Sequence, residues 1–226
     1  MAYEIAKDTC KFRFGMSNPE QLDAWLKENP KAIGLSFVGR SNVGKSSTIN
    51  SLFGKKMAKT SKTPGRTREI NIFSFRLNND GKLDESLPEF YFYDLPGYGH
   101  AQVSKEMSKN WEVLIGTFFS EISLHTLMLN IQDARHPNQK SDQEFHSFLK
   151  EFSFETFILF NKIDKLKKQK ERAALNKLKP VLSKEFKWVK QMYFTSAESK
   201  DGLSQVEEAI ISYLLRQESL LQSMDG

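Results

Sequence analysis

One glycine-rich stretch has residue types that could wrap a chain of phosphates. Residues 39–46 read GRSNVGKS and fit the spacing G-x-x-x-x-G-K-[ST]. Glycines let the backbone curl so that successive N–H groups point at phosphate oxygens, and the helix expected next adds its positive N-terminal end. Lys45 would bring charge to the β- and γ-phosphates, and the Ser46 hydroxyl would bind Mg²⁺. The alternative is a glycine-rich turn with a surface lysine. The predicted nucleotide-binding residues here are Gly39, Arg40, Ser41, Asn42, Val43, Gly44, Lys45, Ser46 and Ser47.

A second motif, Asp94-Leu95-Pro96-Gly97, follows a run of aromatic residues that is typical of a buried strand. An acidic side chain at the end of a strand can hold Mg²⁺, usually through water, so Asp94 is a predicted magnesium ligand. The backbone N–H of Gly97 would contact the γ-phosphate. Alone, this tetrapeptide is a common strand-to-loop turn. It supports a nucleotide site because it follows the phosphate loop in the chain.

A third pair of motifs, Asn161-Lys162-Ile163-Asp164 and Thr195-Ser196-Ala197, follows two later apolar runs. The Asp164 carboxylate can accept hydrogen bonds from guanine N1–H and its 2-amino group, and adenine lacks both donors. Each charge-assisted bond contributes roughly 1.5–3 kcal/mol, so losing both would weaken binding on the order of a thousandfold. Asn161 would brace the loops, the Lys162 stem would lie against the base, and a backbone N–H of residues 195–197 would reach guanine O6. In an open α/β sheet these strand ends meet at one ligand site.

The segment Thr63-Pro64-Gly65-Arg66-Thr67 lies between the first helix after the phosphate loop and the next strand. A mobile segment there would bring Thr67 to Mg²⁺ and the γ-phosphate, with Gly65 and Arg66 beside the nucleotide. The alternative is a Pro-Gly turn before a β-branched residue that starts a strand. The predicted catalytic residues are therefore Lys45, Thr67 and Gly97, and the predicted magnesium ligands are Ser46, Thr67 and Asp94.

The elements that must position these residues alternate along the chain. Six short apolar runs predict strands, at residues 33–38, 71–77, 90–93, 126–131, 157–160 and 192–194. Helix-length segments lie around residues 106–122, 139–152, 169–187 and 204–216, the last with Ser204 and Glu207 spaced as a capping box. This alternation predicts an α/β fold, a mostly parallel six-stranded sheet with helices on both faces. We expect an N-terminal extension (1–30) packed on one domain (31–216), then a C-terminal tail (217–226).

Composition narrows the class of protein. The chain has 226 residues, and its one cysteine, Cys10, excludes a disulfide framework and a cysteine-based zinc cluster. No apolar stretch approaches the roughly 18 residues of a membrane span, and the first residues lack the apolar core of a signal peptide. We therefore expect a cytoplasmic protein with no membrane partner. We also expect a monomer.

The net charge of the chain is positive, and its basic residues are unevenly distributed along the sequence. Lys and Arg total 33 against 28 Asp and Glu, for a net charge of +5. Basic residues gather at 162–190 and at 55–68. The alternative is a solvated face, but a basic pI with two such groups favours a polyanionic partner. Binding to that partner should weaken steeply as the salt concentration rises.

Taken together, these residues resemble the EngB (YihA/YsxC) family of bacterial ribosome-biogenesis GTPases over about residues 12–215. The resemblance rests on residues 39–47, 60–67, 94–99 and 133–137. It implies a P-loop GTPase that uses Mg²⁺, converts GTP to GDP and phosphate, and assists assembly of the large (50S) ribosomal subunit, with a linked requirement for normal cell division and septation. The implied partner is that subunit or its precursor, through rRNA and ribosomal proteins. The chain departs from the family at His100, usually aromatic, at Asn161, often Thr, and in a longer 78–88 loop.

Three residues bear on the rate of hydrolysis. Many GTPases place a glutamine after the D-x-x-G glycine to orient the attacking water, and here Tyr98 occupies that position, which predicts a slow unassisted rate. Asn42 is the residue type with which related GTPases hold K⁺, so it is a candidate potassium ligand. His100 is a candidate general base, with an ordinary loop residue as the alternative. Segments 54–68 and 97–106 are expected to reorder with the γ-phosphate.

Two other functions stay open at this point. An ATP-using P-loop enzyme would be revealed by ATP displacing labelled GTP. A nucleotide-binding cell-division scaffold with negligible turnover would show neither ribosome co-sedimentation nor stimulated hydrolysis.

Overall fold

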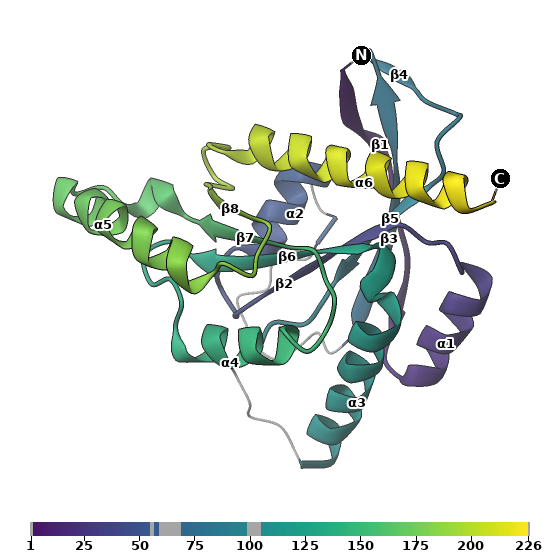
Figure 1. Cartoon of the computed structure of the whole chain (residues 1–226), viewed down its shortest axis with the longest axis horizontal. Helices are drawn as coiled ribbons and strands as arrows, with labels where there is room; N and C mark the ends of the chain where they lie inside the picture. Colours follow the sequence, from purple (N-terminus) through teal and green to yellow (C-terminus); the bar gives the residue numbers. More distant parts are fainter. Residues whose placement is uncertain (1, 55–56, 59–68, 99–104, 226) are drawn as a thin grey trace.

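A central sheet carries helices on both faces (Figure 1). The computed structural model describes residues 2–54, 57–58, 69–98 and 105–225. Within those residues the sheet has eight strands, in the order β1-β3-β5-β2-β6-β7-β8, with the short β4 paired to β3. The strands are β1 (Tyr3–Met16), β2 (Gly34–Gly39), β3 (Ile70–Asn79), β4 (Lys82–Leu83), β5 (Phe90–Asp94), β6 (Thr126–Asp133), β7 (Thr156–Asn161) and β8 (Gln191–Phe194).

The fold class predicted from the sequence is confirmed, and the predicted number of strands is wrong. Strands β5, β2, β6, β7 and β8 run parallel, whereas β1, β3 and β4 pair antiparallel. The six predicted strands are all present, and β1 and β4 are the two additional ones. The mostly parallel order brings the carboxyl ends of five neighbouring strands to one edge, where the predicted motifs lie.

Strand β1 was missed because its side chains do not alternate. It pairs with β3, but its register shifts between Ala6 and Lys11 and again between Phe12 and Phe14. Such bulges change which residues face the core. Buried positions therefore follow no period of two, with Ile5 and Ala6 both buried and Phe12 57% exposed.

Strand β4 belongs to a tight hairpin within the 78–88 segment, which the sequence suggested was an extended loop. Asp80 and Gly81 have φ values of 48° and 78°, and Asn79 pairs with Lys82 across them. Positive φ at both central residues is the geometry of a two-residue hairpin turn, and Asp-Gly favours it.

The helices divide between the two faces of the sheet. Helices α2 (Lys45–Phe53) and α6 (Leu203–Asp225) cover one face. Helices α1 (Pro19–Glu28), α3 (Lys105–Ile122) and α4 (Lys140–Leu149) cover the other, and α5 (Gln169–Glu185) packs near the β7–β8 edge. Short 3₁₀ turns η1 (Ser123–His125) and η2 (Ile163–Lys165) complete the described elements. None of the helices in the described part of the chain has both the length and the apolar character needed to cross a membrane.

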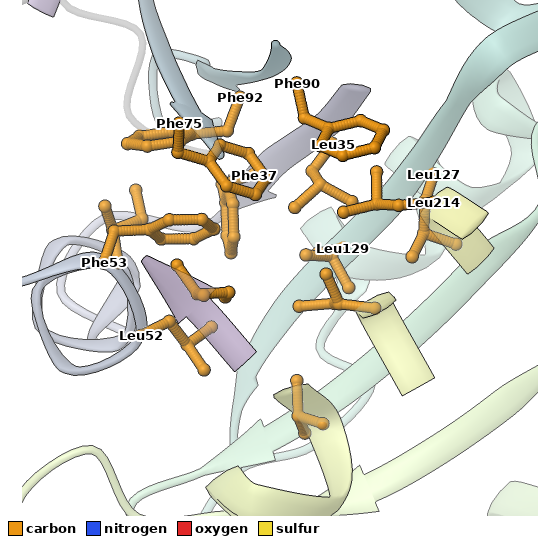
Figure 2. Close-up of a cluster of buried hydrophobic side chains, with 14 of the residues drawn as sticks. Leu35, Phe37, Leu52, Phe53, Phe75, Phe90, Phe92, Leu127, Leu129 and Leu214 are labelled. Atoms are coloured by element: carbon orange, nitrogen blue, oxygen red, sulfur yellow. The ribbon is translucent and has the colours of Figure 1, made fainter. Parts of the chain in front are cut away.

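Aromatic side chains form the core beneath α2. Figure 2 shows Phe37, Phe53, Phe75 and Phe92 gathered between the strands and this helix. The Phe92 ring is fully buried, lies 4.3 Å from the Phe53 ring and stacks on Phe73 at 4.5 Å. This packing holds the last turn of α2, which ends at Phe53, against the sheet.

The C-terminal helix contacts the first strand. Glu207 Oε1 accepts a hydrogen bond from the Ile5 N–H at 3.2 Å. Ser204 lies inside α6, since the helix begins at Leu203, so Ser204 and Glu207 do not form the predicted capping box. The helix also continues to Asp225, through residues that the sequence suggested were a tail.

Candidate functional site

The glycine-rich segment forms a tight loop between β2 and α2. Asn42 and Gly44 have positive φ values of 65° and 100°, which bend the chain into the left-handed region before the helix begins at Lys45. Gly39 packs so closely on the Ile131 carbonyl that a Cβ atom could not fit there. The N-terminal end of α2 therefore follows directly after a compact loop that curls inward. A tight loop followed by a helix N-terminus is the arrangement that binds phosphate.

The predicted phosphate-binding cation and one predicted magnesium ligand face each other. Asp94 is the last residue of β5 and lies beside Phe37 of β2 in the parallel ladder. Its carboxylate forms an ion pair with the Lys45 ammonium, and both side chains are largely buried. Ser46 follows in the first turn of α2, half-buried, and Ser47 is exposed. Lys45, Ser46 and Asp94 are thus grouped at the mouth of the loop.

Gly97 lies directly against the phosphate loop. A Cβ atom on this residue would come within 3.1 Å of the Gly39 carbonyl oxygen and 3.3 Å of the Ser41 amide nitrogen. Tyr98 follows, and its N–H donates to the same Gly39 carbonyl at 3.3 Å. The backbone of the second motif is therefore in contact with the first.

The third motif is tied to the phosphate loop by Asn161, whose side chain is almost completely buried. Its Nδ2 donates to the Val43 carbonyl at 3.0 Å, and its Oδ1 accepts from the Ala197 N–H at 2.9 Å. One amide thus connects three segments distant in sequence. The Ser51 hydroxyl of α2 adds a bond to the Ala197 carbonyl at 2.9 Å.

Asp164 lies in η2 with its carboxylate held by neighbours. Ser196 Oγ donates to Oδ1 at 2.7 Å, and Lys165 Nζ is 3.0 Å from Oδ2. Burial acts to raise the pKa of Asp164, but these hydrogen bonds outweigh it and hold the pKa below its usual value. The carboxylate is therefore an ionised, oriented acceptor. Thr195 contributes main-chain bonds, to Phe160 and Ile163, from a fully buried position.

Lys162 connects the base motif to Asp133 and Arg135. The sequence assigned neither of these two residues an individual role. The Lys162 ammonium contacts the Asn42 carbonyl and lies 3.3 Å from Asp133 Oδ2. Arg135 binds the same carboxylate through two nitrogens, at 2.9 and 2.6 Å. Burial would raise the pKa of Asp133, but the Arg135 hydrogen bonds and the Lys162 charge lower it to about 2. The signal for this role was the 133–137 motif itself.

The Tyr98 side chain is hydrogen-bonded to helix α4, and this contact was not predicted from the sequence. Its hydroxyl donates to Asp142 Oδ1 at 2.8 Å and accepts from Asn130 Nδ2 at 3.1 Å. Arg40, the second residue of the phosphate loop, donates through Nε to both Asp142 oxygens, at 2.9 and 3.0 Å. Asp142 is the third residue of α4, and an acidic residue at that place gives no signal of distant partners, so only the fold brings it here.

The structure thus brings together most of the predicted site residues: the phosphate loop, Asp94, Gly97, Asn161, Lys162, Asp164, Ser196 and Ala197. Gly65, Arg66 and Thr67 lie outside the described residues, as does His100.

Comparison with known proteins agrees with this arrangement. A family model described as "50S ribosome-binding GTPase" matches residues 35–162. The probable GTP-binding protein EngB of Prosthecochloris aestuarii is 41% identical over 168 residues, covering 74% of this chain and 81% of that protein. The corresponding protein of Mycoplasmopsis synoviae is 36% identical over 202 residues, covering 89% and 98%.

Solved structures share the fold. The crystal structure of a probable GTP-binding protein EngB aligns with a TM-score of 0.54 at 22% identity, over 81% of this chain and 99% of that one. Era from Aquifex aeolicus, solved with GDP and aluminium fluoride, aligns with a TM-score of 0.63 at 23% identity, over 80% of this chain and 56% of that one. From the family model and from relatives matched over most of their length, the chain belongs to the EngB family of GTP-binding proteins, a family of GTPases.

Proposed function

We propose that this chain is a molecular switch that binds GTP and GDP and hydrolyses GTP to GDP and phosphate. The observation that carries the proposal is the Asn161 amide, which bonds both the Val43 carbonyl of the phosphate loop and the Ala197 N–H of the base motif. One nucleotide needs a phosphate site and a purine site at a fixed separation. Asn161 joins the loops that form the two.

Magnesium fits the residues beside Lys45. A serine hydroxyl and an aspartate carboxylate are the hard oxygen ligands that Mg²⁺ prefers, and the Asp94 side chain already faces the phosphate-binding lysine. We propose that Ser46 and Asp94, the latter usually through water, hold the ion together with Thr67. An ion held by these residues would offset the negative charge of the nucleotide phosphates.

The unassisted rate of hydrolysis is proposed to be slow. Tyr98 occupies the position after Gly97, and its hydroxyl is already bonded to Asp142 and Asn130. A phenol held there does not orient a water for attack, so Tyr98 does not take the part that a glutamine plays at this position in many GTPases. Lys45 and the Gly97 N–H remain to stabilise the charge that develops on the γ-phosphate.

Guanine selection gives the sharpest test of the nucleotide site. In Asp164→Asn, an amide replaces the carboxylate that would accept from guanine N1–H and the 2-amino group. We expect GDP affinity to fall on the order of a hundred- to thousandfold, because two charge-assisted bonds are lost. Xanthosine diphosphate, with a carbonyl in place of the 2-amino group, should bind the variant better than the original chain.

The matched control is Asp201→Asn, which changes an exposed carboxylate bonded to Ser199 on the same side of the fold. It should leave both affinities unchanged. If Asp164→Asn binds GDP as tightly as the original chain does, or if excess ATP displaces labelled GTP, the guanine-specific proposal is refuted.

The proposed partner is the large ribosomal subunit or its precursor, with the chain assisting subunit assembly in the cytoplasm. Support comes from the matching family, described as 50S ribosome-binding, and from the charge of the segment that contains α5. Between residues 162 and 190 the basic side chains are Lys162, Lys165, Lys167, Lys168, Lys170, Arg172, Lys177, Lys179, Lys184, Lys187 and Lys190, and all but Lys162 are exposed. An exposed basic helix suits rRNA phosphates.

Sedimentation with large subunits tests this partner. We expect co-sedimentation with a non-hydrolysable GTP analogue, less with GDP, and steep weakening as salt rises. The double variant Lys170→Glu, Lys177→Glu should reduce binding, whereas Lys82→Glu on β4 should not. Equal sedimentation in both nucleotides, or none in either, would contradict the proposal. A division or septation defect on depletion is proposed as a consequence of failed subunit assembly.

A further inference from the structure

A buried polar cluster lies between the phosphate loop and helix α4, and Arg40 is the one member that is also a predicted nucleotide-binding residue. Its members are Arg40, Tyr98, Asn130, Asp142 and His146, and we refer to them as the Tyr98 cluster. Asn130 and Asp142 are fully buried, and His146 is 4% exposed. Burying this many polar groups is costly unless each is bonded, so their mutual hydrogen bonds require an explanation.

The bonds converge on the Tyr98 hydroxyl. It donates to Asp142 at 2.8 Å and accepts from Asn130 at 3.1 Å. The Asn130 amide is itself oriented, because its Oδ1 accepts from Gln132 Nε2 at 3.0 Å. Burial and the Asp142 charge raise the pKa of Tyr98 well above its usual value, so the phenol stays a neutral donor.

Packing reinforces these polar bonds. The Tyr98 ring stacks on Phe145 of α4 with centroids 4.5 Å apart and an interplanar angle of 11°. Arg40 approaches Asp142 from the phosphate-loop side and also donates to the His136 carbonyl at 3.1 Å. Tyr98 is therefore fixed at its hydroxyl by two elements, β6 and α4, and along its ring by a third contact.

Fixing the Tyr98 side chain also fixes the main chain just before it. Residues 40 and 98 form a parallel β-bridge, and the Tyr98 N–H donates to the Gly39 carbonyl. Gly97 consequently sits against the phosphate loop, where a Cβ would come 3.3 Å from the Ser41 nitrogen. If the Tyr98 hydroxyl lost its partners, the Gly97 backbone would lose its nearest side-chain anchor.

We propose that the Tyr98 cluster sets the preference for a nucleoside triphosphate over a diphosphate, by holding the Gly97 N–H where a γ-phosphate would meet it. The inference rests on the proposed function. The loop amides and Lys45 bind a β-phosphate whether or not a third phosphate is present. Only the γ-phosphate reaches Gly97. Tyr98 and Asp142 are positioning residues in this account, because they act through the Gly97 backbone.

The test compares affinities for two nucleotides in a variant that keeps the ring. Tyr98→Phe retains the stack on Phe145 and removes only the hydroxyl. We expect its affinity for a fluorescent non-hydrolysable GTP analogue to fall about 5- to 20-fold, since one hydrogen bond to a charged group is lost. Its affinity for the matching GDP should change less than about twofold, since that ligand does not reach Gly97. Asp142→Asn should shift the ratio in the same direction.

Tyr91→Phe is the matched control. It removes a hydroxyl from β5 that bonds Asn29 at 3.3 Å, away from the phosphate loop, and should leave both affinities unchanged. A cluster that only stabilises the fold would lower both affinities of Tyr98→Phe equally, or neither, and either result overturns the inference. If the original chain binds neither guanine nucleotide, the proposed function fails first, and the inference fails with it.

Discussion

Gly44 and Asn161 are predicted to be energetically coupled, although 117 positions separate them in the chain. A Cβ atom at Gly44 would lie well inside 3.0 Å of Asn161 Nδ2, closer than real Cβ contacts. Gly44→Ala must therefore displace the amide that bonds Val43 and Ala197. The new side chain would also sit at a φ of 100°, a left-handed conformation that costs an L-residue about 1–2 kcal/mol.

The expected change in the free energy of unfolding follows from the groups that lose their hydrogen-bond partners. Asn161→Ala leaves the Val43 carbonyl and the Ala197 N–H without their side-chain partner, which should lower the free energy of unfolding by about 2–4 kcal/mol. Gly44→Ala should cost a similar amount plus the strain. In the double variant the amide is already absent, so only the strain is added. The two changes should therefore fall short of additivity by about 2 kcal/mol.

The assay is urea unfolding of the nucleotide-free protein, followed by circular dichroism, for both single variants and the double variant. Gly81→Ala is the control, because Gly81 has a φ of 78° but nothing within 4 Å of the added carbon. It should cost only the strain and add to Asn161→Ala within about 0.5 kcal/mol. If Gly44→Ala is equally additive, the Asn161 amide does not contact the loop as described.

Three further predictions concern the core, the α4 interface and the loop. Phe92→Ala should lower the free energy of unfolding by about 3–5 kcal/mol in denaturant titrations, whereas exposed Phe12→Ala should cost about 1 kcal/mol or less. Burial, with the Lys150 charge, lowers the pKa of His146 to about 4, below its usual 6.5, so the unfolded chain takes up the proton first. Stability should then fall by on the order of 3 kcal/mol as pH drops from about 6.5 to 4. His146→Gln should lose less over that interval, and identical pH profiles would contradict the assignment. Finally, if Asn42 helps to hold K⁺, hydrolysis should be faster in KCl than in NaCl, and Asn42→Gly, which tolerates the φ of 65°, should abolish the difference; equal rates in both salts would remove the hypothesis.

The parallel core of the fold was predictable because its strands are buried on both faces. Runs such as Phe157–Phe160 read as continuous apolar segments, and the glycine-rich loop marked where the first of them ends. Strand β1 was not predictable in the same way, since two bulges interrupt its alternation. The length of α6 was underestimated because its last turns are mostly polar and half-exposed, which resembles a tail.

Within the site, sequence could identify residues that occur in compact motifs, and it could not identify their long-range partners. Asp164 stands in a recognisable tetrapeptide, and Ser196, which orients it, belongs to a second motif. Asp142 has no comparable signal, because a single acidic residue in the first turn of a helix ordinarily reads as a favourable helix-end charge. Its bonds to Arg40 and Tyr98 exist only because the sheet places α4 beside the phosphate loop.

Strand β3 is hydrogen-bonded on both sides, to β1 along nearly its whole length and to β5 over five residue pairs. A slide of two residues would carry it about 7 Å and break both ladders at once. Strand β3 therefore cannot slide along its own axis between the two ends of the sheet. A change at the carboxyl edge of the sheet is therefore not passed to the opposite edge by movement of this strand along its own axis.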